Sequence, residues 1–135
     1  SVEFDKVWEY TAAHDYELSD CYALNVDTDR VWACPYTDFP IIEIESDRAT
    51  VRATRNVSGP RGLLVAGEHV ALLGDYANEG SLLIGQVSDL SRLKKRELGM
   101  PDGRGVPPAP LTCRSSVADL FVGADWFTFD LAQTL

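Results

Sequence analysis

The sequence has 135 residues, of which 45% are hydrophobic and 24% are charged, a balance typical of one soluble globular domain. The formal net charge of −9 argues against nucleic acid or an anionic membrane as a partner, because phosphate binding needs clustered Lys and Arg. No apolar run approaches the length that crosses a bilayer, and no signal-peptide pattern opens the sequence.

The N-terminal stretch at residues 2–12 predicts two short strands that break near residues 5–6. Trp8 and Tyr10 alternate there with polar neighbours, as side chains do on a half-buried strand. A polar connection at 14–20 follows, and it separates these strands from the clearest β-unit of the chain.

That central unit contains three strands joined by short turns. Its strands are rich in apolar side chains, and its turns carry Asp and Thr, which suit tight turns. Residues 47–55 then alternate small apolar side chains with Thr and Arg, which predicts an outer strand with one solvent-exposed face. The first three strands are expected at 22–26, 30–36 and 41–46.

A second unit begins after the turn signal at 58–60. Its first three strands are expected at 63–66, 69–73 and 82–87. Residues 91–98 fit either a short helix capped by Ser91 or an outer strand, and the repeat favours the strand. A loop rich in Gly and Pro occupies 99–110, and loops of this length are often functional.

The hairpins repeat one order, in which an apolar strand, a turn ending in an acidic residue and a second apolar strand follow each other. A shift of 39 residues aligns Leu24 with Leu63, and a further shift of 57 aligns Leu63 with Leu120. A period of about 40 residues with four strands is typical of a propeller blade. The repeats are placed near 20–62, 63–116 and 117–131.

The chain carries, in order, the segments WEY, DCYALNV, VWACPY and FPIIEI. With its alternating strands and recurring turns, this order resembles β-propeller repeat proteins of the broad WD40, YVTN and NHL-like kind. The Gly-His and Trp-Asp signatures of WD40 blades do not occur, so the resemblance concerns architecture and transfers no functional residue. It implies a scaffold for binding, and sometimes an enzyme.

We therefore expect a single all-β domain over 1–135, with about three four-stranded antiparallel blades of a partial β-propeller; a β-sandwich is the alternative. Three blades do not close a ring, because propellers use about four to eight. Either a missing upstream segment or dimerisation would complete it. In a homodimer, residues 126–131 of one chain would pair with the N-terminal strands of the other.

Five residues mark the expected mouth of the central channel, where the innermost strands of propellers begin and ligands commonly sit. The repeat places Asp20, Tyr22 and Arg61 there, together with Arg114 and Ser115. A carboxylate beside two guanidinium groups can hold a small polar or anionic ligand. Alternatively, these charges cap strands and pair with one another.

Other polar residues suggest metal sites less directly. Residues 27–29 have the spacing of oxygen ligands but lack the downstream Gly and Glu of a calcium loop, which favours a polar turn. Asp20, Asn25, Glu43 and Glu45 could build a metal site of the propeller-lactonase sort, although a solvated strand face explains the two glutamates as well. No catalytic residue and no metal ligand is assigned. The Trp and Tyr residues are expected in core and inter-blade packing.

These features predict a non-catalytic binding or protein-interaction scaffold, with a metal-assisted hydrolase or lactonase at the channel mouth as the alternative. No cofactor is expected, and the partner is an unknown protein or a small polar ligand. The three cysteines form no metal pattern and no even disulfide set, and Cys21 and Cys34 are expected as buried thiols. Free thiols favour a cytoplasmic location.

Overall fold

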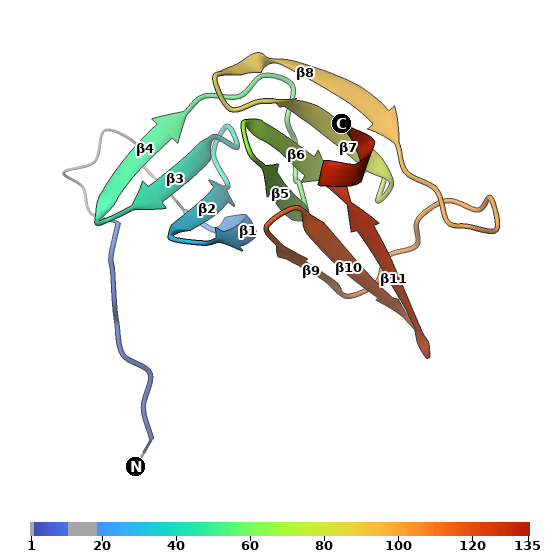
Figure 1. Ribbon diagram of the computed structural model, residues 1–135, viewed down its shortest axis with the longest axis horizontal. Coiled ribbons are helices and arrows are strands. Elements are labelled where there is room, and N and C mark those ends of the chain that lie inside the picture. Colours follow the sequence, from blue (N-terminus) through green and yellow to red (C-terminus); the bar gives the residue numbers. More distant parts are fainter. Residues whose placement is uncertain (1, 11–18) are drawn as a thin grey trace.

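The computed structural model describes residues 2–10 and 19–135, which form three antiparallel β-sheets (Figure 1). The first sheet contains β1 (Cys21–Asp27), β2 (Arg30–Pro35), β3 (Ile41–Glu45) and β4 (Arg48–Arg52) in that order. The second contains β5 (Gly62–Ala66), β6 (His69–Leu73), β7 (Ser81–Gln86) and β8 (Asp89–Glu97). The third contains β9 (Leu111–Arg114), β10 (Val117–Val122) and β11 (Asp125–Asp130), and a short 3₁₀ helix, η1 (Leu131–Thr134), follows. The prediction of an all-β chain is confirmed.

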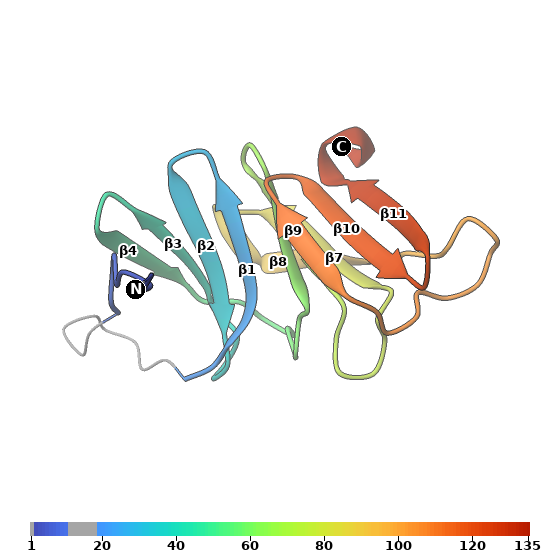
Figure 2. The same cartoon turned by 90° about the horizontal axis from the view of Figure 1, so that it is seen from below.

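The three sheets spread outward from β1, β5 and β9, which lie together near the middle of the molecule (Figure 1). These three inner strands run in the same direction, as the arrowheads of β1 and β9 indicate in Figure 2. Backbone hydrogen bonds join the strands where they end: Ser115 N donates to Val26 O at 3.2 Å, and Val65 N donates to Ser115 O at 2.9 Å. The strands β4, β8 and β11 lie at the periphery.

The second sheet forms the centre of the protein because it is covered on both faces. One core lies between the first and second sheets around Trp32 and Leu63, and the other lies between the second and third sheets around Leu64 and Leu131. The strands β5 and β6 are therefore apolar at almost every position instead of alternating.

The N-terminal part differs from the sequence prediction. Residues 2–10 contain no strand, so the two predicted strands are wrong over the described residues, and residues 11–12 lie outside them. Val2, Phe4 and Val7 are almost fully exposed. Strand propensity alone does not make a strand, because a stable strand also requires pairing within a sheet.

The third sheet also differs, because it begins one strand earlier than the repeat predicted. β9 precedes the hairpin of β10 and β11, so the third repeat, predicted at 117–131, begins too late, and within the described residues the third sheet has three strands in place of the four of a full blade. β9 has only four residues and follows a run of Gly and Pro, which left its pattern too short to recognise.

Two further predictions have clear outcomes. Residues 91–98 fall largely within β8, so the strand is confirmed over the helix; pairing with β7 overrides the helix propensity of this segment. Cys34 is buried as predicted, whereas Cys21 is exposed, so that part of the prediction is wrong. Among the described residues, no helix has the length and apolar character needed to span a membrane.

Candidate functional site

The five residues of the predicted mouth lie at two opposite ends of the inner strands. Asp20 and Tyr22 are at the beginning of β1, and Arg61 immediately precedes β5. Arg114 and Ser115 instead follow the other end, where Ser115 N bonds to Val26 O. Four residues of strand, or about 13 Å, separate Tyr22 from Val26. The predicted cluster is therefore wrong, because placing the third repeat one strand late reversed the end to which Arg114 and Ser115 were assigned.

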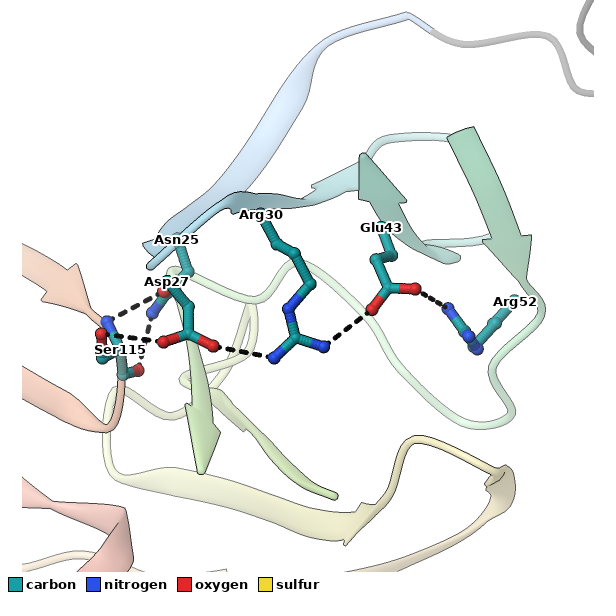
Figure 3. A network of polar contacts seen from close by, with 6 residues as sticks. All are labelled: Asn25, Asp27, Arg30, Glu43, Arg52 and Ser115. Atoms are coloured by element: carbon teal, nitrogen blue, oxygen red, sulfur yellow. Dashed lines mark hydrogen bonds and ion pairs between the residues drawn. The ribbon is translucent and has the colours of Figure 1, made fainter. Parts of the chain in front are cut away.

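At the Ser115 end, the buried amide of Asn25 joins all three sheets, and Figure 3 shows its contacts with Ser115. Its Nδ2 atom donates to Leu63 O at 2.6 Å and to Ser115 O at 2.9 Å, and its Oδ1 atom accepts a hydrogen bond of 2.9 Å from Ser115 N. Asn25 is only 1% exposed, so its hydrogen-bonding groups are used within the protein. Its geometry indicates a structural role.

A chain of charged side chains continues from this amide along the first sheet (Figure 3). Asp27 accepts from Ser115 Oγ at 3.2 Å and pairs with Arg30 at 2.9 Å. Glu43 pairs with Arg30 at 3.1 Å through one oxygen and with Arg52 at 3.4 Å through the other. Two carboxylates thus balance two guanidinium groups, which leaves this network without net charge for an anionic ligand.

The same network bears on the metal-site hypothesis. Both oxygens of Glu43 contact guanidinium groups, and the amide of Asn25 is bonded to backbone groups. Within residues 2–10 and 19–135, no three or more His, Cys, Asp or Glu side chains are grouped so that they could hold a metal ion.

Arg61, at the opposite end, is also held by neighbouring groups. Its guanidinium pairs with Glu79 and donates to Ala109 O at 3.1 Å. Arg61 therefore links the loop before β7 to the 99–110 loop, and it is not available as the pair to Arg114 that the sequence suggested.

The same end carries an exposed group of aromatic rings, which we call the tyrosine cluster: Tyr22, Tyr36 and Tyr76 above Phe39. The three tyrosines are 38%, 47% and 63% exposed, whereas Phe39 is buried beneath them. Tyr22 stacks on Tyr36 with ring centroids 5.8 Å apart, and it meets Phe39 and Tyr76 edge to face at 5.3 and 6.1 Å. The cluster combines Tyr22 of β1, two residues of the loop between β2 and β3, and Tyr76 of the loop between β6 and β7 into one surface.

The backbone beneath the tyrosine cluster adopts an unusual conformation. Thr37, Asp38 and Phe39 have φ values of 75°, 61° and 47°, so three successive non-glycine residues lie in the left-handed region. Each such residue costs roughly 1–2 kcal/mol. The hydroxyl of Thr54 donates to Phe39 O at 2.7 Å and helps to hold this loop. Strained backbone of this kind concentrates at binding and active sites.

The absence of a side chain at Gly59 leaves room for the Tyr76 ring in the cluster. A Cβ atom at this position would lie 2.6 Å from the Tyr76 ring, and its φ of 59° also favours glycine. The Tyr76 ring therefore packs directly on the backbone at Gly59 although the residue is exposed.

Tyr76 also has an altered acidity. Its hydroxyl donates a hydrogen bond of 3.1 Å to the Tyr22 hydroxyl, and this bond, together with partial desolvation, raises the pKa of Tyr76 to about 12. The neutral phenol is thus the favoured form at neutral pH.

We expect one tyrosine to ionise near pH 12, whereas an ordinary tyrosine ionises near about pH 10. Because the pKa is raised in the folded protein, the stabilisation from this bond is complete below about pH 10 and is lost as the pH rises to about 12. Phenolate absorbance followed against pH would measure the transition. Tyr76→Phe should remove it, and Tyr22→Phe should move it down toward the ordinary value. Circular dichroism of the same samples checks folding, and a Tyr22→Phe titration identical to that of the wild type would contradict the assignment.

Sequence reasoning included Tyr22 but missed Tyr36, Phe39 and Tyr76. It expected the tyrosines in core or inter-blade packing; Tyr22, Tyr36 and Tyr76 are too exposed for the core, whereas the contact between Tyr22 and Tyr76 does join the first sheet to the second. Trp32, by contrast, is fully buried as expected. The usable signal was the presence of single aromatic residues among turn-forming neighbours, in YTDFP and GDYANEG.

No model of a known protein family matches this chain, and no curated protein matches it either.

Proposed function

We propose that the protein is a non-catalytic binding scaffold, and that the tyrosine cluster takes up a positively charged segment of a partner protein. The observation that carries this proposal is the cluster itself: three exposed tyrosine rings pack on a buried Phe39, whose backbone is in the left-handed conformation. Fixed, exposed aromatic side chains favour recognition because little conformational entropy is lost when they are covered.

Charge supports a basic partner over the anionic ligand that the sequence suggested. The exposed Asp20 and Asp38 lie within two residues of cluster members, and the whole chain has a formal charge of −9. Lys and Arg side chains stack favourably on tyrosine faces, at about 0.5–1 kcal/mol for each exposed contact. The acidic surroundings would also speed the encounter with a basic segment.

The arrangement of the sheets supports a propeller-like scaffold over a two-layer sandwich. Three sheets pack face to face in succession, and each contributes its first strand to one central group that runs in a single direction. In such a scaffold the beginnings of the inner strands form a binding surface, which is where the tyrosine cluster lies. The free thiols of Cys21, Cys34 and Cys113 support a reducing location such as the cytoplasm.

The proposal is tested by calorimetric titration with a short Lys- and Arg-containing peptide and with a control peptide in which Gln replaces both residue types. We expect the basic peptide to bind and the Gln peptide to bind far more weakly. The double variant Tyr36→Ser/Tyr76→Ser should weaken binding by about tenfold, since two ring contacts are lost.

Phe121→Ala is the matched control, because Phe121 is an exposed aromatic residue on β10, outside the cluster. Equal binding of both peptides, or an unchanged affinity in the double variant, would refute the proposal.

A further inference from the structure

The third sheet is one strand short of the other two. In the first and second sheets the outermost position is taken by β4 and β8, whereas the third sheet ends at β11. Within the described part of the chain, the outer edge of β11 therefore has backbone N–H and C=O groups without a strand partner. Such an edge is a template for an added strand.

Residues 2–10, VEFDKVWEY, have the alternating pattern of an amphipathic strand. In an extended strand Val2, Phe4, Trp8 and Tyr10 would share one face with Lys6, and Glu3, Asp5 and Glu9 would share the other with Val7. The segment forms no strand here, and the side chains of Val2 and Phe4 are fully exposed. Exposed apolar side chains on an amphipathic strand pattern indicate a surface that is covered elsewhere.

A pocket beside β11 can accommodate the apolar face of an extended segment with the sequence of residues 2–10. It has a volume of about 390 Å³ and is lined by Met100, Pro101, Val122 and Phe127, among others. Phe127 pairs with Leu120 and Phe129 with Ala118, on the face of the third sheet that packs on the second. A strand added at β11 would place every second side chain along this face, next to the 99–110 loop.

Residues 2–10 do not lie at β11 of their own chain. Figure 1 shows residues 2–10 extending away from the first sheet, and Figures 1 and 2 both place them on the opposite side of the molecule from β11. We propose that residues 2–10 of a second copy pair antiparallel with β11 as the fourth strand of the third sheet. Twofold symmetry makes the exchange reciprocal, so that one dimer satisfies both open edges.

Light scattering across a dilution series of the full chain tests the proposal, with hydrogen exchange of the β11 amides measured in parallel. We expect a dimer with protected β11 amides. Phe4→Asp should weaken dimerisation by about tenfold or more and expose those amides, because it places a charge on the apolar face. Asp5→Asn, on the opposite face of the same segment, should leave the dimer intact.

Phe4→Asp is informative because Phe4 packs on no core and its replacement does not endanger folding. A chain lacking residues 1–10 should be monomeric and should bind a synthetic peptide of those residues. A monomeric full chain, or a dimer that persists in both variants, would overturn the proposal. A monomer with protected β11 amides would show that the segment folds back onto its own chain.

Discussion

Asn25→Ala should lower the free energy of unfolding by about 3 kcal/mol. The substitution removes the three hydrogen bonds between Asn25 and the backbone of Leu63 and Ser115, which join β1 to β5 and to the turn after β9. Because the site is buried, water does not readily replace the lost partners, and a small cavity remains. Urea unfolding curves, compared at equal m-values, would measure the change.

Two variants sharpen this experiment. Leu24→Ala alters the preceding residue of β1, which is 54% exposed, and should cost less than about 1 kcal/mol. Asn25→Asp has nearly the same shape but places a carboxylate against the carbonyl oxygens of Leu63 and Ser115, so it should destabilise the protein at neutral pH and recover partly in acid. If Asn25→Ala cost no more than Leu24→Ala, the amide would not join the sheets as described.

Trp32→Ala should cost about 4 kcal/mol, the largest loss we expect from a single side chain. Trp32 is fully buried in the core between the first and second sheets, and its ring lies 5.0 Å from the Arg30 guanidinium. The substitution removes both the buried apolar surface and the ring that contacts the Arg30 guanidinium. Thermal or urea unfolding would measure the loss.

Trp126→Ala is the matched control, since Trp126 is the same residue type but 67% exposed on β11, and its loss should cost less than about 1 kcal/mol. Trp32→Phe should cost clearly less than Trp32→Ala. It keeps most of the ring and removes the indole N–H, which is buried without a hydrogen-bond partner among the described residues. Equal losses for Trp32→Ala and Trp126→Ala would contradict the core described above.

Much of the fold could be predicted because strand alternation and turn residues are local signals. The first sheet follows from its apolar strands and Asp-containing turns, and β8 follows from the repeat although its residues favour a helix. The four residues of β9 were missed because two apolar side chains after a Pro-rich loop carry too little pattern. That single omission moved Arg114 and Ser115 to the wrong end of the molecule.

The candidate site could not be predicted in the same way because it depends on long-range packing. Tyr22, Tyr36 and Tyr76 come from separate parts of the chain and meet only because the first and second sheets pack together. The left-handed backbone at 37–39 could not be predicted from the sequence either, because Thr and Phe are unfavourable in the left-handed region. The predicted N-terminal strands are wrong over the described residues for a related reason: the pattern is local, but a strand also depends on pairing with a second strand, which no local pattern specifies.

The double burial of the second sheet has a consequence for how the protein opens. A peripheral sheet can detach by exposing one apolar interface, whereas β5 and β6 can separate from their surroundings only when both interfaces are lost. We therefore expect the free energy of local opening to differ between the sheets. The first and third sheets should open as separate cooperative units at lower free energy, whereas the second sheet should open only in global unfolding. The tyrosine cluster spans the boundary between the first unit and the second, so a partner bound there would hold these two units together and suppress the easier opening.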